Sequence, residues 1–259
     1  MKKALTVSNV TIGYRNGKRT ISVVDGINAS LHDCELVALI GKNGAGKSTL
    51  LRTLSAFQKP LSGVIECCGK NMAEMSVSDV AKDLAVVLTA NESVPLTVRE
   101  LVALGRTPYT DFLGRTTGKD DMVVEYAMDT MAVKQFEDRM VATLSDGERQ
   151  KCMIAKALAQ ETSIILLDEP TAFLDFGSKV SLFRTLKRLS KEQQKAILVS
   201  THDIELAIKF ADRIWLLSDG KMSEGTVDEL SDNGVLQNFI DSDGLFYDKE
   251  NNRIEITLI

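Results

Sequence analysis

The chain has 259 residues, 44% hydrophobic and 26% charged, which is typical of a globular protein with a sizeable core. Its formal charge of −5 argues against a protein whose main task is to grip nucleic acid, and we expect no nucleic-acid partner. Apolar stretches are about strand length, shorter than the roughly 20 residues of a membrane span. Residues 1–7 contain two lysines with no apolar run behind them, which argues against a secretory signal.

The first third of the chain is rich in strand patterns. Turn chemistry at 15–18 separates the first two strands, and the third leads directly into a glycine-rich loop. Helical spacing follows at 48–57, and residues 64–70 predict a short hairpin. The three strand candidates are 4–10, 21–24 and 35–40.

The middle of the chain, roughly residues 97–159, has a different pattern. Leu101, Val102 and Leu104 form one helical stripe, and residues 122–131 form another. Residues 105–118 contain glycines, Pro108 and polar side chains, so we expect a loop there. We interpret the whole region as a helical insertion.

Strand patterns return in the last third of the chain. Strands that alternate with helical segments predict a parallel sheet with helices packed against it, and hence an α/β fold. The polar tail after Gly220 indicates no function. The three strand candidates of this part are 163–167, 196–199 and 213–217.

The chain has four cysteines, Cys34, Cys67, Cys68 and Cys152. Adjacent Cys67 and Cys68 are poor disulfide partners for each other, and no cysteine spacing resembles a zinc-binding motif. Four free thiols are typical of a reducing cytoplasm.

The glycine-rich loop is the central motif of the sequence. It reads Gly41-Lys42-Asn43-Gly44-Ala45-Gly46-Lys47-Ser48-Thr49, which fits Gly, four residues, then Gly-Lys-Ser. Glycines allow amide groups to turn inward around phosphates, and the helix that follows adds its positive end. Lys47 is placed to reach the β- and γ-phosphates, and the Ser48 hydroxyl to ligate Mg²⁺. The alternative is a glycine turn without a ligand, but the strand before it and the helix after it favour a nucleoside triphosphate, ATP above all. The expected nucleotide contacts are Gly41, Asn43, Gly44, Ala45, Gly46, Lys47, Ser48 and Thr49.

Two later strands end in polar residues that suit the same chemistry. Residues 164–167 are followed by Asp168, a second candidate ligand for Mg²⁺, and by Glu169, which is placed to polarise an attacking water. Alone, two acids after an apolar strand could simply be leaving a core. His202 follows another apolar strand at the edge of the sheet that faces ligands, which favours a contact to the γ-phosphate over a merely structural role.

Together with Leu144-Ser145-Asp146-Gly147-Glu148-Arg149-Gln150, these motifs resemble the ATPase subunit of ABC transporters. The resemblance covers about residues 5–225 in the expected order. It implies a P-loop NTPase with a RecA-like mixed or parallel sheet core, an N-terminal antiparallel β subdomain and an inserted helical subdomain. The implied bounds are 1–240 for the ATPase domain, with about 97–159 as the helical subdomain, and 241–259 for a tail of unknown role.

The resemblance also implies further site residues and a second copy of the chain. Tyr14 would stack on adenine, and Asp175 would be the acid of the D-loop. In the family two subunits pair head to tail, so that Ser145 and Gly147 of one copy would complete the phosphate site of the other. Amides at a helix start suit that role.

The sequence departs from the family pattern at three positions. Asp146 stands where the signature has glycine, and Glu148 where it has glutamine. Both add negative charge near the start of a phosphate-binding helix. A glutamine usually follows the strand that here reads 84–88, and this chain has Thr89 instead.

Residues 97–109 look like the importer branch that handles iron-siderophores, haem and cobalamin. The implied function is ATP hydrolysis, with Mg²⁺, that powers import by separate transmembrane permease subunits. A substrate-binding protein would take part indirectly, and the chain would lie peripherally on the cytoplasmic face of the inner membrane.

Two other functions remain open from the sequence. A soluble ABC-type ATPase acting on nucleic acid or ribosomes would share the motifs, but such proteins usually fuse two ATPase halves, and this chain has one glycine loop and a negative charge. A small-molecule kinase would use the same loop, but it leaves residues 144–150 and Asp175 unexplained.

Overall fold

The computed structural model describes residues 2–17, 19–88, 94–110, 116–240, 245–249 and 253–256. Within them a six-stranded sheet has the order β10-β9-β3-β8-β7-β6. Strands β6, β7, β8, β3 and β9 are parallel, and β10 adds an antiparallel edge. The strands are β3 (Leu36–Gly41), β6 (Leu84–Val87), β7 (Ile164–Leu167), β8 (Ala196–Ser200), β9 (Arg213–Ser218) and β10 (Lys221–Gly225).

The side chains of the main sheet alternate between two hydrophobic cores. In β3, Leu36, Ala38 and Ile40 join a core shared with the helices, whereas Val37 and Leu39 join a core shared with the N-terminal strands. Successive strand residues point to opposite faces, so a sheet covered on both faces needs an unbroken apolar run. The apolar run at 36–40, within the strand candidate at 35–40, therefore marked a central strand of this sheet.

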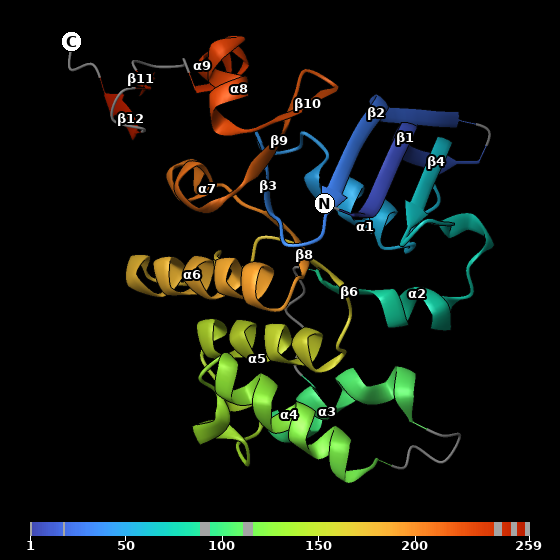
Figure 1. The fold of residues 1–259 in the computed structure, drawn as a ribbon, viewed down its shortest axis with the longest axis vertical. Helices are drawn as coiled ribbons and strands as arrows, with labels where there is room; N and C mark the ends of the chain where they lie inside the picture. Colours follow the sequence, from blue (N-terminus) through green and yellow to red (C-terminus); the bar gives the residue numbers. More distant parts are fainter. Residues whose placement is uncertain are drawn as a thin grey trace.

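The N-terminal strands form a separate antiparallel sheet in the order β2-β1-β4-β5. It packs on the main sheet together with α1 (Lys47–Leu54), and Figure 1 shows α1 beside β1, β2 and β4. The helix expected to reach residue 57 ends at Leu54, because Ala56 has φ 61°, outside the right-handed helical region. The strands are β1 (Lys3–Asn16), β2 (Arg19–His32), β4 (Ser62–Cys67) and β5 (Lys70–Asn71).

Between β6 and β7 the described chain is helical. Figure 1 places α3, α4 and α5 at the end of the molecule opposite to β1, β2 and β4. Helix α5 contacts both α3 and α4. Helix α2 precedes β6, while α6 and α7 follow β7 and β8. The helices are α2 (Val77–Asp83), α3 (Val98–Ala103), α4 (Gly118–Thr130), α5 (Asp146–Ala159), α6 (Phe176–Glu192) and α7 (Ile204–Phe210), with short 3₁₀ turns η1 (Met72–Glu74), η2 (Leu104–Tyr109), η3 (Lys134–Phe136) and η4 (Val141–Thr143).

The loop expected over 105–118 is wrong in its first part. Residues 104–109 form the 3₁₀ helix η2, and the buried Arg106 fixes it. The Arg106 guanidinium donates to Asp120 at 2.8 Å, and to Glu161 and the Ala159 carbonyl at 2.7 Å each. A buried guanidinium needs such partners. They lie far from Arg106 in the sequence, so the local glycine and proline pattern could not predict this helix.

The chain after β10 folds into two short helices and a hairpin. Figure 1 shows β11 and β12 near the C-terminus, beyond α9. No helix in the described part of the chain has the length and apolar character needed to cross a membrane. The elements are α8 (Val227–Asp232), α9 (Val235–Ile240), β11 (Leu245–Asp248) and β12 (Arg253–Ile256).

Candidate functional site

The glycine loop connects β3 to α1 at the carboxyl end of the main sheet. Gly44 and Gly46 have φ values of 78° and 104°, which side-chain-bearing residues rarely adopt. A Cβ on Gly46 would also lie 2.7 Å from Cγ1 of Val23. The loop therefore needs glycine at these positions, and its backbone turns tightly into the first turn of α1.

A hollow of about 240 Å³ lies over this loop. On one side the Tyr14 hydroxyl forms a hydrogen bond with Thr49 Oγ1 at 2.6 Å, while half of the Tyr14 side chain stays exposed. Its lining residues are Tyr14, Val23, Asn43, Gly44, Gly46, Lys47, Ser48, Thr49 and Glu169. The structure thus brings Tyr14, most of the loop and Glu169 to one place, although they are far apart in sequence.

Lys47 is a buried cation at the floor of the hollow. Its ammonium group donates to the Gly41 carbonyl at 2.8 Å and lies 4.0 Å from Glu169 Oε1. Burial lowers the pKa of Lys47, while the negative charges of Glu169 and Asp168 act in the opposite direction. A buried ammonium group that water screens poorly attracts a phosphate strongly, so Lys47 suits phosphate binding.

Asp168 and Glu169 follow β7 and share one partner, Ser200 at the end of β8. The Ser200 hydroxyl donates to Asp168 Oδ1 at 2.7 Å and accepts from the Glu169 amide at 2.9 Å. Asp168 is buried, and Glu169 has a φ of 48°, a left-handed conformation that costs energy for a residue other than glycine. The strained backbone turns the Glu169 side chain toward Lys47.

His202 lies two residues beyond β8 and faces Glu169. Its Nε2 atom is 2.5 Å from Glu169 Oε1, and its side chain is partly exposed. Figure 1 places β8 in the middle of the molecule, next to β3. The carboxyl ends of β3, β7 and β8 therefore deliver Lys47, Glu169 and His202 to one edge of the sheet, where open α/β sheets bind ligands.

Ser200 and Asp203 are two residues of this region that sequence reasoning missed. Asp203 accepts from Thr171 Oγ1 at 2.9 Å and from Lys179 Nζ at 3.0 Å, which ties the turn after Glu169 to α6. The sequence carried a signal, because Ser200 and Asp203 flank Thr201 and His202 at the end of an apolar strand.

Ser145 and Glu148 form a capping box at the start of α5. The Glu148 amide donates to Ser145 Oγ at 3.3 Å, and Glu148 Oε2 accepts from the Ser145 amide and hydroxyl at 2.8 Å each. These hydrogen bonds lower the pKa of the Glu148 carboxyl. Either glutamate or glutamine can fill this position of a capping box, so Glu148 keeps the local structure despite its charge.

Gly147 and Asp175 lie on neighbouring segments. A Cβ on Gly147 would approach Leu174 Cδ2 to 2.9 Å, so a larger residue would press on the segment before α6. Asp175 caps α6 by accepting from the Ser178 amide at 2.9 Å, which lowers the pKa of its carboxyl. Neither these two residues nor Ser145 lines the hollow over the glycine loop.

Comparison with known proteins assigns the fold and the family. A family profile for ABC transporters matches residues 24–172, more than half of the chain. The chain belongs to the ABC transporter family. The resemblance inferred from the sequence motifs is confirmed, and the chain is an ATP-binding, ATP-hydrolysing cassette.

Similar ABC proteins extend over most of the chain. An uncharacterised ABC transporter ATP-binding protein of Methanocaldococcus jannaschii is 42% identical over 84% of this chain and 74% of its own length. The iron(3+)-hydroxamate import ATP-binding protein of Bacillus subtilis is 36% identical over 90% and 86%. The petrobactin import ATP-binding protein of Bacillus anthracis is 39% identical over 78% and 75%.

Solved ABC structures share the fold. A dimeric bacterial ABC transporter cassette superimposes with a TM-score of 0.77 at 28% identity, over 86% of this chain and 98% of the other. An inward-facing structure assigned to the metal-chelate type of ABC transporter also has a TM-score of 0.77, at 26% identity over 91% and 89%. The α/β fold with a mixed sheet, expected from the sequence, is confirmed.

Two further parts of this ABC cassette bear on its partners. Thr89, which stands where the family usually has glutamine, lies outside the described residues. A groove of about 190 Å³ runs beside the start of α5, and its walls combine apolar side chains with the charges of Asp146, Arg149 and Lys156. Its lining residues are Val94, Leu101, Leu104, Val141, Asp146, Arg149, Gln150, Met153, Lys156 and Phe173.

Proposed function

We propose that this chain is the ATPase subunit of an importer for metal chelates such as iron-siderophores, haem or cobalamin. The observation that carries the proposal is the meeting of Lys47, Glu169 and His202 over the glycine loop, in a chain similar to hydroxamate and petrobactin import ATPases. The class of cargo is inferred from these relatives. The ATPase site does not reveal it, because a permease and a binding protein select the transported compound.

ATP binds along the hollow, with adenine stacked on the exposed ring of Tyr14. The amides of the loop surround the β- and γ-phosphates, and Lys47 exchanges its bond to the Gly41 carbonyl for a phosphate oxygen. The loop residues that contact the phosphates are Gly41, Asn43, Gly44, Ala45, Gly46, Lys47, Ser48 and Thr49.

Mg²⁺ fits the oxygen donors at this site. Ser48 lines the hollow, and the buried Asp168, whose negative charge acts on Lys47, has its carboxylate oriented by Ser200. Hydroxyl and carboxylate oxygens are the donors that Mg²⁺ prefers. When bound, the ion would neutralise charge on the phosphates.

Hydrolysis is an in-line attack of water on the γ-phosphorus. The new bond joins the water oxygen to phosphorus, the bond to the β,γ-bridging oxygen breaks, and the products are ADP and inorganic phosphate. Glu169 orients the water and takes up its proton, while His202 holds the γ-phosphate and keeps the Glu169 carboxylate in place. Lys47 stabilises the charge that develops on the phosphate oxygens.

A second copy of the chain completes the site. Ser145, Gly147 and Asp175 lie away from the hollow of their own copy, and in a head-to-tail dimer they reach the nucleotide of the partner. The capped start of α5 presents a hydroxyl and helix amides, which are the groups that bind phosphate at helix N-termini. The dimeric cassette with the same fold supports this arrangement.

The groove beside α5 receives the permease. It combines apolar walls with charges of both signs, which suits an amphipathic helix of a partner. It is formed mainly by the helical subdomain, about 97–159, of an ATPase domain that spans 1–240, with residues 241–259 as a tail. The chain then lies peripherally on the cytoplasmic face of the inner membrane, and a substrate-binding protein acts through the permease.

Deletion and complementation test the cargo and the partner together. The gene is deleted from its host, and uptake of labelled ferric hydroxamate, haem and cobalamin is measured with and without the wild-type chain supplied in trans. We expect loss of uptake of one class, restored by the wild-type chain, which copurifies with a permease. Unchanged uptake of all three, or salt-sensitive copurification with ribosomes, would replace the importer with a soluble ATPase.

A further inference from the structure

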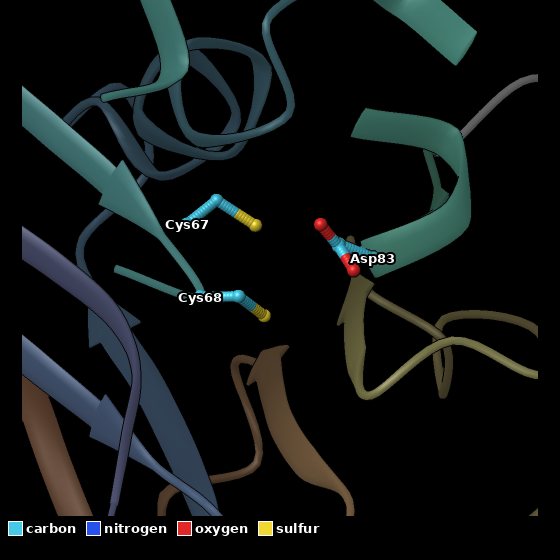
Figure 2. Close-up of side chains that lie close together, drawn as sticks. All are labelled: Cys67, Cys68 and Asp83. Carbon is cyan, nitrogen blue, oxygen red and sulfur yellow. The ribbon is translucent and has the colours of Figure 1, made fainter. Parts of the chain in front are cut away.

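Three potential metal ligands meet on a part of the molecule that the ATPase site does not use. Cys67 is the last residue of β4, Cys68 follows it, and Asp83 is the last residue of α2. The two Sγ atoms and a carboxylate oxygen of Asp83 all lie within 4.8 Å of one another. Figure 2 shows both thiols directed toward the Asp83 carboxylate across a short gap.

The backbone explains why two adjacent cysteines face the same ligand. In a regular strand neighbouring side chains point to opposite faces of the sheet. Cys68 leaves the strand with a φ of 50°, in the left-handed region, so its side chain turns to the side of Cys67. Cys67 and Cys68 do not form a disulfide, and all four cysteines are free thiols.

The surroundings hold the three groups together. Ser163, just before β7, lies with its Oγ 3.6 Å from Cys68 Sγ, and its hydroxyl donates to the Asp83 carbonyl at 3.2 Å. Cys67 is fully buried in the core beneath the antiparallel sheet, whereas Cys68 and Asp83 are partly exposed. An ion can therefore enter from solvent and meet ligands that are anchored by the fold.

We propose that Cys67, Cys68 and Asp83 bind a single zinc ion. Two thiolates and one carboxylate suit this ion, because Zn²⁺ takes both sulfur and oxygen ligands, whereas Mg²⁺ and Ca²⁺ prefer oxygen and Cu(I) prefers sulfur. Around a tetrahedral zinc with bonds of about 2.3 Å, ligand atoms lie roughly 3.8 Å apart, so the ligand atoms need to approach one another by at most about 1 Å. A water molecule fills the fourth position, and binding releases the two thiol protons.

The bound ion joins two parts of the fold that are distant in sequence. Cys67 ends strand β4 of the antiparallel sheet and Cys68 lies in the turn between β4 and β5, while Asp83 lies directly before β6 at the edge of the main sheet. Binding only to the folded arrangement would stabilise it as the free ion concentration rises above the dissociation constant. The bound ion would thus cross-link the N-terminal sheet and the α2–β6 junction, and this site is separate from the ATPase site.

Titration with Co²⁺ tests the proposal, since thiolate ligation of Co²⁺ gives an intense absorption band in the near ultraviolet. The full-length chain is kept reduced with a phosphine, titrated with Co²⁺ and then with Zn²⁺, and zinc per chain is measured after dialysis. We expect about one ion per chain, a thiolate band that Zn²⁺ abolishes, and a higher melting temperature with zinc.

Variants distinguish this site from adventitious binding. Cys68→Ser and Asp83→Asn should each weaken Zn²⁺ binding about tenfold or more, and Cys68→Ser should also diminish the thiolate band. Cys34→Ser, which removes another partly exposed thiol, should change neither. Cys67→Ser is a second thiol variant but perturbs a buried position, so Cys68→Ser and Asp83→Asn decide the case. Undiminished binding in these two, or loss of binding in Cys34→Ser, would overturn the proposal.

Discussion

In the proposed mechanism the glycine loop and the start of α5 both offer helix amides to an anion, but the side chains around them differ. Over the glycine loop, Lys47 is buried beside Glu169, and His202 lies within 2.5 Å of that glutamate. At the start of α5, the Ser145 hydroxyl and Glu148 satisfy each other, and Arg149 pairs with Asp146 at 3.1 Å. The glycine loop combines a buried positive charge with a hollow that suits phosphate, whereas the polar side chains at the start of α5 are hydrogen-bonded to one another.

This difference indicates that the two regions should fail in different ways. Damage at the glycine loop removes nucleotide binding or chemistry in each copy of the chain. Damage at α5 should leave nucleotide binding to the glycine loop of the same copy intact and should impair only what that copy contributes to the site of its partner. The four variants below follow that division, from the largest expected effect to the smallest.

Glu169→Gln should have the largest effect. Removing a group that takes up a proton costs roughly 10²- to 10⁴-fold in rate, while the amide keeps the size of the side chain. We expect ATP binding to persist, phosphate release to fall by that factor, and an ATP-bound dimer to accumulate in size-exclusion chromatography. Turnover at the wild-type rate would remove Glu169 from the chemistry.

Lys47→Ala should weaken nucleotide binding about 10- to 100-fold, because a hydrogen bond to a charged group contributes about 1.5–3 kcal/mol. Equilibrium binding of a fluorescent ATP analogue measures it. Lys59→Ala, an exposed lysine outside the loop, is the matched control and should bind normally. Equal affinity in Lys47→Ala and Lys59→Ala would contradict the assignment of the loop.

Ser145→Ala should lower turnover about tenfold and leave ATP affinity of the isolated chain unchanged, since the lost hydroxyl would contact the partner's nucleotide. It should also destabilise the fold by about 1 kcal/mol through loss of the cap. Ser76→Ala removes the comparable cap of α2. We expect it to match Ser145→Ala in urea unfolding but keep its turnover, and equal turnover in both would reduce Ser145 to a structural cap.

Glu148→Gln should have the smallest effect, visible in its pH dependence. Hydrogen bonds from Ser145 lower the pKa of Glu148 in the folded chain, so the charged carboxylate stabilises the fold above its unfolded pKa. That contribution disappears as pH falls through the lowered pKa. Because Glu148 is only partly buried and solvent screens its charge, the free energy of unfolding of the wild type should exceed that of the variant by only a few tenths of a kcal/mol at pH 7, and the two values should converge toward acid. A difference in free energy of unfolding between the wild type and Glu148→Gln that stays the same at every pH would contradict this prediction.

Much of the phosphate site was predictable because it depends on local sequence. The loop at 41–49 is a continuous motif, and Asp168, Glu169 and His202 each follow an apolar strand, so the rule that parallel strands end at one edge brings them together. The parallel sheet and the burial of β3 on both faces follow from the same alternation of strands and helices, whereas the order of the strands was not predicted.

Other features were not predictable because they depend on partners distant in sequence. The 3₁₀ helix at Arg106 is fixed by Asp120 and Glu161, which no local pattern links to it. The grouping of Cys67 and Cys68 with Asp83 likewise requires knowing that α2 ends beside β4. The roles proposed for Ser145 and Asp175 depend on a second copy, and they were inferred from the family resemblance because no local pattern in the chain implies one.

The Ser200 hydroxyl has a consequence that concerns the assembly of the sheet. The hydroxyl oxygen of Ser200 on β8 contacts both the Asp168 carboxylate and the Glu169 amide after β7. Both hydrogen bonds form only when β7 and β8 are correctly aligned. A slip of one residue would turn Ser200 to the opposite face of the sheet and remove its hydrogen bonds to the Asp168 carboxylate and the Glu169 amide together. If these two acids act as proposed, a cassette with misaligned strands would not hydrolyse ATP at all, and it would not waste ATP in hydrolysis uncoupled from transport.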